Sequence, residues 1–281
     1  MPFFSSARPH VFAHRGGRAL GPENTIAAFD LGLAAGADGL ELDVHLSSDG
    51  VVVVCHDDTL DRTTGASGAV GALTAAELAK VDAGCRFRDG QGAYPFRERG
   101  VGIPALHEVL HRYPGIPVIV EMKVDSAAMG RAVAAEVEAA GAQDRVCAAG
   151  YSRRAMEAAR AALPGMATSA CHAEVRWAVY RSLAGWPVRQ VPYQVYQVPE
   201  RAGLIRVASR RFIRHAHDAG LGVQVWTVDE EADMRRLLEW GADALISNRP
   251  DLAVSVRDRW VTERAEGTET ANTEQRSNGG P

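Results

Sequence analysis

Residues 39–57 read GLELDVHLSSDGVVVVCHD, and this stretch decides how the rest of the chain is interpreted. Within it, residues 39–46 and 51–55 form two runs rich in Val and Leu, which is typical of β-strands. Only residues 47–50 (SSDG) separate the two runs. A parallel crossover needs about a dozen residues, whereas a hairpin needs only a few. The stretch therefore predicts a hairpin-like element.

Short apolar runs alternate with longer helical stretches along the rest of the chain. The expected strands, with the two of the hairpin, are 11–13, 39–46, 51–55, 117–122, 145–149, 167–171, 188–195, 222–228 and 244–247. The expected helices are 25–35, 126–140, 152–162, 174–183, 209–219 and 230–240. This β-then-α order predicts a parallel sheet with right-handed crossovers.

The first expected helix follows Asn24, a residue type that is favoured at helix N-caps. The expected strands number one more than an eight-stranded barrel needs, and the hairpin accounts for the surplus. The pattern therefore favours an α/β barrel over an open sheet, although the spacing alone does not establish that the sheet closes.

Two segments depart from this rhythm. Residues 58–103 are long, polar and rich in glycine, and insertions of this kind often cover a site. Residues 262–281 lack apolar content and predict a disordered tail. We therefore expect one barrel domain over residues 9–255, with 58–103 as an insertion beside its site.

Composition excludes several classes of protein. A net charge of −4 and a pI of about 6.1 argue against a general nucleic-acid binder, but not against a small anionic substrate. No apolar run reaches the ~18 residues of a membrane span, and no signal peptide is evident. The four cysteines form no C-x-x-C pair, so a disulfide framework is not expected and the cytoplasm is the default compartment.

Polar residues gather where the expected strands end. His14 and Arg15 follow the first strand, and side chains at such ends point into the mouth of a barrel. Glu41 and Asp43 are two residues apart and share one face of their strand. Two such carboxylates repel each other, so either a divalent ion such as Mg²⁺ or Ca²⁺ or nearby Arg or Lys side chains should lie between them.

The hairpin register links these carboxylates to a second histidine. If residue 46 pairs with residue 51, Glu41 lies opposite His56 and Asp43 lies opposite Val54. Directly opposed Cβ atoms are within about 5.5 Å of each other. On this register, which a bulge would break, the acidic pair and His56 share one neighbourhood.

Glu121 and Lys123 are again residues of one face at a strand end. Glu121 can supply a third carboxylate and Lys123 can neutralise a phosphate, or the two can form a simple surface ion pair. Trp226 ends a later strand, where it can contact an apolar part of a substrate or belong to the core. Asn248 is expected to order the end of the last strand, with no catalytic role.

Taken together, six short motifs resemble one family: HRG (14–16), PENT (22–25), ELD (41–43), HD (56–57), ExK (121–123) and WTV (226–228). In order and spacing over residues 9–252, the chain resembles the glycerophosphodiester phosphodiesterases. The resemblance implies an eight-stranded TIM-type barrel that hydrolyses glycerophosphodiesters to sn-glycerol 3-phosphate and an alcohol. It implies a divalent ion, Mg²⁺ or Ca²⁺, at Glu41, Asp43 and Glu121.

The same resemblance implies roles for the other site residues. His14 and His56 match the acid–base histidines, Arg15 and Lys123 match phosphate-contacting positions, and residues 58–103 match an insertion that members carry. One motif departs from the family, because residues 247–250 read SNRP where members commonly have T-D-x-P. Two alternatives remain open, namely a lysophospholipase D-like activity and a barrel that binds without catalysis. The sequence indicates neither the alcohol head group nor the oligomeric state.

Overall fold

Eight parallel strands form a nearly closed barrel in the computed structural model, which describes residues 8–277 and the side chains of residues 8–266. Around the barrel the strands follow the order β6 (Ala167–Thr168), β5 (Val146–Gly150), β4 (Val118–Met122), β2 (Gly39–Leu46), β1 (His10–Ala13), β11 (Ala244–Ser247), β10 (Gly222–Trp226) and β7 (Val195–Pro199). A parallel bridge between Ser169 and Val195 brings the two edges of the sheet together. The predicted α/β barrel is confirmed.

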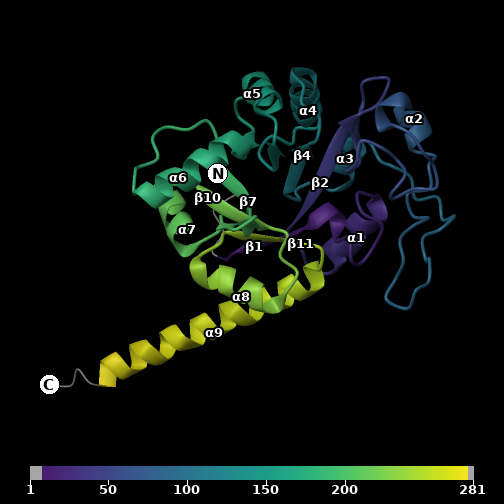
Figure 1. Ribbon diagram of the computed structural model, residues 1–281. Coiled ribbons are helices and arrows are strands. Elements are labelled where there is room, and N and C mark those ends of the chain that lie inside the picture. Colours follow the sequence, from purple (N-terminus) through teal and green to yellow (C-terminus); the bar gives the residue numbers. More distant parts are fainter. Residues whose placement is uncertain (1–7, 278–281) are drawn as a thin grey trace.

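Helices surround this barrel on its outside (Figure 1). They are α1 (Ile26–Ala34), α3 (Leu106–Arg112), α4 (Ala127–Ala139), α5 (Arg153–Ala162), α6 (His172–Ala184), α7 (Arg210–His217), α8 (Glu231–Trp240) and α9 (Pro250–Ser277). Of these, α3 and α9 were not expected, and residues 106–112 make a helix of only two turns with little sequence signal. The strands are buried on both faces, which explains their nearly continuous apolar runs.

The lumen of the barrel is filled with apolar side chains below the layer of polar residues. The members of this cluster are Phe12, Ile119, Cys147, Ala149, Ala167, Val195, Ala244 and Ile246. Larger apolar clusters fill the space between the strands and the surrounding helices. The polar residues at the upper strand ends therefore stand on a packed floor rather than over a pore.

The expected hairpin is present, but its register differs from the prediction by one residue. Strand β3 (Val52–Val54) runs antiparallel to β2 and pairs Val44 with Val54 and Leu46 with Val52. Ser47 N donates to Val51 O at 3.0 Å, so the turn contains three residues rather than four. Gly50, with φ of 78°, takes the left-handed position of such a turn. The prediction that Glu41 lies opposite His56 was therefore wrong.

The structure also corrects the start of a later strand and the cap of the first helix. The strand expected over 188–195 begins only at Val195, because Pro187 precedes the expected run and Pro192 interrupts it, and a proline lacks the N–H that a strand ladder needs. The N-cap of α1 is Thr25, whose side chain accepts a hydrogen bond from Ala28 N. Asn24, which we expected to cap this helix, has φ of 59° and turns its side chain toward β2 instead.

The insertion 58–103 carries α2 (Ala75–Leu78) and packs on the hairpin through a small apolar core. This core joins Val53 and Cys55 to Leu60, Val70, Leu78, Ala83 and Ile103. Away from the barrel, α9 continues as helix to Ser277, through a segment for which we expected disorder (Figure 1). Extending an existing helix adds about one backbone hydrogen bond per residue, which lets a polar sequence stay helical. Residues 278–281 of that segment lie outside the described residues.

Among the described residues, a search for helices with a long enough apolar window to cross a bilayer finds none.

Candidate active site

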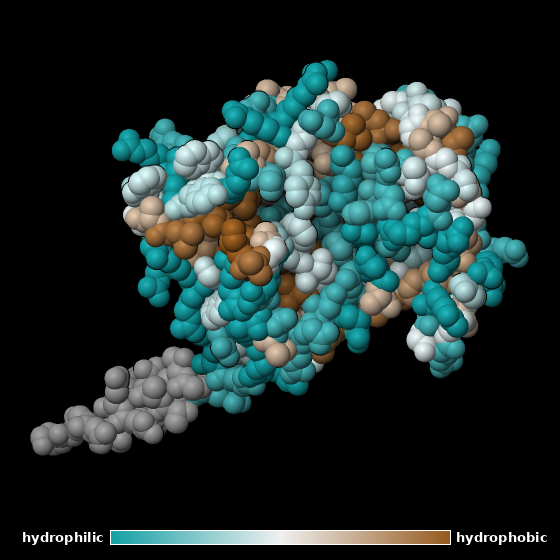
Figure 2. Space-filling model, in the orientation of Figure 1, coloured by the Kyte–Doolittle hydropathy of each residue, from teal (hydrophilic) through white to brown (hydrophobic). Residues whose placement is uncertain are grey.

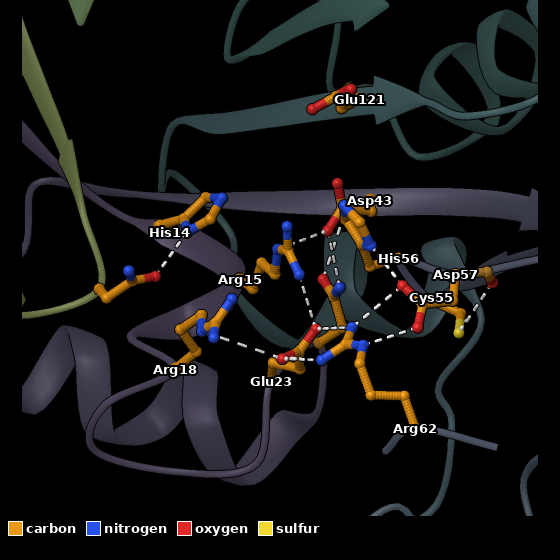
Figure 3. Close-up of polar contacts among 12 residues, drawn as sticks. His14, Arg15, Arg18, Glu23, Asp43, Cys55, His56, Asp57, Arg62 and Glu121 are labelled. Atoms are coloured by element: carbon orange, nitrogen blue, oxygen red, sulfur yellow. Dashed lines mark hydrogen bonds and ion pairs between the residues drawn. The ribbon is translucent and has the colours of Figure 1, made fainter. Parts of the chain in front are cut away.

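The carboxyl ends of β1, β2 and β4 bring charged side chains to one end of the barrel (Figure 3). Because side chains alternate along a strand, Glu41 and Asp43 both point inward from β2, and Glu121 joins them from the adjacent strand β4. One oxygen from each of these three residues lies within 4.8 Å of the others. The neighbours along the chain, Leu40 and Leu42, are buried against the helices.

Three clustered carboxylates are costly to keep charged. Burial raises the pKa of Glu41 well above its usual value, and the charges of Asp43 and Glu121 add to the effect. Burial also raises the pKa of Glu121, although the ammonium of Lys123 opposes this shift. Such a set of hard oxygen ligands fits a Mg²⁺ or Ca²⁺ ion, which would offset the repulsion. The ammonium of Lys123 already lies 2.8 Å from Asp43 Oδ1, so an ion bound here would share this oxygen with Lys123.

Asp43 is nevertheless held as a carboxylate by its neighbours. Burial alone would raise its pKa, but Lys123 and Arg15 outweigh burial and lower the pKa below its usual value. Lys123 Nζ lies 2.8 Å from Asp43 Oδ1 and 2.8 Å from Glu121 Oε1. Arg15 Nε lies 3.2 Å from Asp43 Oδ2. The alternative expectation of ion pairing is thus met at Asp43, and Lys123 joins two of the three carboxylates.

The turn after β1 shapes the backbone around these carboxylates. Arg15 has φ of 52°, and its backbone N–H donates to Glu41 Oε2 at 2.9 Å. Gly16 follows with φ of 85°, and a Cβ there would lie 2.7 Å from Phe29 Cδ1. Asn24 donates from Nδ2 to Asp43 Oδ2 at 2.8 Å, which orients this carboxylate from behind. Position 16 of this turn therefore needs glycine, both for its positive φ and because a side chain would not fit.

His14 is buried at the end of β1, and its two ring nitrogens have different partners. Nδ1 lies 2.6 Å from Asn248 Oδ1, while Nε2 faces Glu41 Oε2 at 3.9 Å. Asn248 in turn donates from Nδ2 to Asp229 Oδ2 at 2.6 Å, which fixes the orientation of the amide. The amide oxygen can only accept, so the network assigns the ring proton to Nδ1. Burial lowers the pKa of His14 to about 4, only partly opposed by the bond to Asn248.

His56 has a different environment, just beyond β3. Its Nδ1 lies 2.6 Å from Asp57 Oδ1, and its side chain is 31% exposed. Arg62, from the insertion, donates from Nε to Asp57 Oδ2 at 2.6 Å and from Nη1 to Glu23 Oε2 at 2.9 Å. The hydrogen bond from Arg62 holds the pKa of Asp57 well below its usual range. Glu23 also accepts from Arg15 Nη1 at 2.8 Å, so a charged network joins Arg15, the neighbour of His14 in the chain, to the region of His56 (Figure 3).

Aromatic rings form one side of the mouth. Trp226, half-buried at the end of β10, packs on the apolar cluster of the lumen. The ring of Tyr151, just after β5, meets it edge to face with centroids 6.4 Å apart. Trp226 therefore belongs to the rim of the barrel and has a flat apolar neighbour. Its position is therefore compatible both with contact to an apolar part of a substrate and with a place in the core.

The structure thus gathers most of the residues that the sequence singled out. His14, Arg15, Glu41, Asp43, Glu121 and Lys123 lie together, and His56 joins them through the charged network. Sequence reasoning missed several supporting residues, namely Glu23, Asp57 as the partner of His56, Arg62, Tyr151 and Asp229. Asn248 contacts a catalytic candidate, which we did not expect. The PENT motif contained a signal for Glu23, whereas nothing in the insertion marked Arg62 out.

Comparisons with known proteins identify the family of the chain. The sequence profile described as the glycerophosphoryl diester phosphodiesterase family matches residues 14–252. A glycerophosphodiester phosphodiesterase of Caldanaerobacter subterraneus subsp. tengcongensis is 28% identical over 88% of this chain and 96% of its own length. A putative glycerophosphodiester phosphodiesterase of Bacillus subtilis is 31% identical over 87% of this chain and 96% of its own length.

A solved structure shows the same arrangement of the chain. A phosphodiesterase of Oleispira antarctica, in complex with the product sn-glycerol-3-phosphate, matches with a TM-score of 0.73 and 26% identity. The match covers 89% of this chain and 97% of that protein. The profile match spans most of the chain, and the barrel and the order of its motifs agree with it. The chain therefore belongs to the glycerophosphoryl diester phosphodiesterase family and is a phosphoric diester hydrolase.

Proposed function

We propose that this enzyme hydrolyses glycerophosphodiesters to sn-glycerol 3-phosphate and an alcohol, with a divalent cation and two histidines at the end of the barrel. The single observation that carries the proposal is the cluster of Glu41, Asp43 and Glu121 beside His14. Three carboxylates with a neighbouring acid–base group are a suitable set for phosphodiester hydrolysis.

Glu41, Asp43 and Glu121 would hold Mg²⁺ or Ca²⁺, since both ions prefer oxygen ligands. When bound, the ion supplies positive charge against the non-bridging oxygens of the phosphate. Arg15 and Lys123 add fixed positive charge from two sides of the same cluster. Both cations are largely buried, where their interaction with a phosphate is stronger than it is in water.

The two histidines are suited to opposite proton transfers. His14 carries its proton on Nδ1 toward Asn248, which leaves the Nε2 lone pair directed at the carboxylate cluster. Its low pKa keeps this ring neutral at pH 7, so Nε2 can take the proton of the nucleophile, which is either water or the neighbouring glycerol hydroxyl. Attack by water gives sn-glycerol 3-phosphate directly, whereas attack by the glycerol hydroxyl gives a cyclic phosphate that a water molecule then opens to the same product. His14 is therefore the proposed general base.

His56 is the proposed general acid. The carboxylate of Asp57 at Nδ1 places a negative charge 2.6 Å from the ring, which pairs with an imidazolium. As the P–O bond to the alcohol breaks, His56 would give the proton on Nε2 to the leaving oxygen. The proton taken by His14 and the proton given by His56 balance over the reaction.

The proposed division of the chain follows from these contacts. Residues 9–255 carry the catalytic barrel, and the insertion 58–103 contributes Arg62 to the support of His56. All four cysteines are free, which supports the proposal that the enzyme works in a reducing compartment such as the cytoplasm.

Release of sn-glycerol 3-phosphate from glycerophosphocholine tests the proposal. The purified protein should release it, EDTA should stop the release, and added Mg²⁺ or Ca²⁺ should restore it. Release that is unaffected by exhaustive chelation would exclude the cation. No release from any glycerophosphodiester, together with turnover of lysophosphatidylcholine, would favour the lysophospholipase D-like alternative.

A further inference from the structure

One segment of this acidic protein is strongly basic. Residues 172–217 contain eight arginines, no lysine and two glutamates, giving a formal charge of +6 in a chain of net charge −4. The segment includes α6, the loop that follows it, the hairpin of β8 (Arg201–Ala202) and β9 (Ile205–Arg206), and α7. Positive charge is therefore concentrated in one segment of an otherwise acidic chain.

Most of these arginines carry a charge that no acidic side chain neutralises. Among the described residues, seven of the eight form no ion pair, namely Arg176, Arg181, Arg189, Arg201, Arg210, Arg211 and Arg214. The two glutamates of the segment are neutralised by arginines from elsewhere. Glu174 pairs with Arg160 at 3.0 Å and Glu200 pairs with Arg236 at 2.7 Å. The positive charge of the segment thus stays uncompensated.

Large apolar side chains share this basic surface. Trp177, Tyr180, Leu183 and Trp186 are each between 56% and 61% exposed. The first three follow one another at intervals of three residues and lie on the outward face of α6. The rings of Trp177 and Tyr180 touch, with centroids 6.3 Å apart. Figure 2 shows hydrophobic side chains at the surface on the side where Figure 1 places α6 and α7.

Contacts between the two helices join these residues into one surface. Arg211 Nη2, on α7, donates to Leu183 O at 2.7 Å. His215 Nε2, one turn later, lies 2.7 Å from Trp186 O. We call the exposed side chains of α6, of residues 185–190 and of α7 the α6–α7 surface. Aromatic and basic groups on it are fixed relative to one another rather than spread over independent loops.

The α6–α7 surface begins beside the mouth of the barrel. His172, the first residue of α6, lies against the ring of Tyr151, with centroids 6.1 Å apart. Tyr151 in turn meets Trp226 at the rim of the site. A partner that covers α6 would therefore lie next to the entrance of the site.

We propose that the α6–α7 surface binds the headgroup layer of an anionic phospholipid membrane. Arginines attract acidic lipid headgroups, and Trp and Tyr side chains favour the boundary between headgroups and acyl chains. A helix with Trp and Leu between arginines is typical of this mode of binding. A second copy of the chain fits less well, because a two-fold contact would set these uncompensated arginines against each other.

Co-sedimentation with vesicles, without substrate, tests this proposal independently of the proposed hydrolysis. The intact protein should bind vesicles of equimolar phosphatidylglycerol and phosphatidylcholine, should release them at about 1 M salt, and should not bind pure phosphatidylcholine. The triple variant Arg176→Gln, Arg210→Gln, Arg214→Gln should bind about 100-fold more weakly, since each basic residue near the surface adds about a factor of five. Its catalytic activity on a water-soluble diester should stay the same.

The matched control is the triple variant Arg99→Gln, Arg131→Gln, Arg154→Gln, which removes the same charge from other exposed sites that form no ion pair among the described residues. It should bind vesicles like the intact protein. Equal loss in both variants would overturn the assignment to α6 and α7, as would a lack of binding by the intact protein. Self-association without lipid that is abolished by Trp177→Ala with Trp186→Ala would show an interface between copies and would also overturn it.

Discussion

The two histidine regions of the site are built in different ways. His14 stands on the end of a barrel strand, is buried, and is supported by the neutral amide of Asn248. His56 stands beyond a hairpin strand, is partly exposed, and is supported by the carboxylate of Asp57 and by Arg62 from the insertion. One residue type can therefore be prepared for two different proton transfers by the charge of its hydrogen-bond partner.

Removing either ring should have the largest effect. His14→Ala and His56→Ala should each lower kcat by about 10²- to 10⁴-fold, the usual contribution of a general acid or base. His107→Ala, an exposed histidine on α3, is the matched control and should keep full activity. Steady-state kinetics on glycerophosphocholine measures all three. If either variant kept full kcat, the histidine that it lacks would not be the proposed general acid or base.

The burial of His14 predicts a pH dependence of stability in the metal-free protein. Its folded pKa of about 4 lies below the unfolded value of 6.5, so the unfolded chain binds more protons between these values. The free energy of unfolding should therefore fall as pH drops from 6.5 toward 4, by up to about 3 kcal/mol. In His14→Gln this part of the slope should vanish. Urea unfolding in EDTA at several pH values measures it, and an unchanged slope would contradict the assigned environment.

The amide between Asp229 and His14 should matter through the position of the ring proton. Asn248→Ala should lower kcat by about 10- to 100-fold, as the loss of an orienting partner commonly does. The paired exchange Asn248→Asp with Asp229→Asn keeps an acceptor at His14 but makes it a carboxylate, which favours the imidazolium, so it should not recover the loss. Nitrogen NMR of labelled histidine should show the Nδ1–H form in the intact protein. An Nε2–H form would contradict the proposed base.

The insertion should have the smallest effect on the chemistry. Arg62→Ala removes the hydrogen bonds that Arg62 donates to Asp57 and to Glu23. Because Asp57 then loses one charge-assisted hydrogen bond, we expect kcat to fall by about tenfold or less. Arg97→Ala, in the same insertion but bonded to Cys85 O, should leave kcat unchanged. Equal losses in the two variants would show that the insertion acts through its folding rather than through Arg62.

The sequence predicted the residues on barrel strands better than those in the hairpin and the turns. Residues on barrel strand ends, such as Glu41, Asp43 and Glu121, could be placed because alternation on a strand sets the face that each side chain takes. The hairpin register could not, because a turn of three residues closed by Ser47 replaced the expected turn of four. The choice between Asn24 and Thr25 as helix cap depended on a bond from Asn24 to Asp43 across the fold.

Arg62 and Asp229 show the same limit. Their roles depend on contacts between segments that are far apart in the sequence, such as the insertion with Glu23 and the end of β10 with the end of β11. No local pattern marks such residues. The family motifs identified the chemistry, whereas the fold alone revealed which neighbours support it.

We assign the donation of a proton to the leaving group to His56 and not to His14. Comparing glycerophosphocholine with a glycerophosphate ester of p-nitrophenol tests it directly, because p-nitrophenolate leaves without being protonated. We predict that His56→Ala recovers most of its activity on the p-nitrophenyl ester, while His14→Ala stays impaired on both substrates. Recovery of His14→Ala with no recovery of His56→Ala would contradict the account and would reverse the two roles.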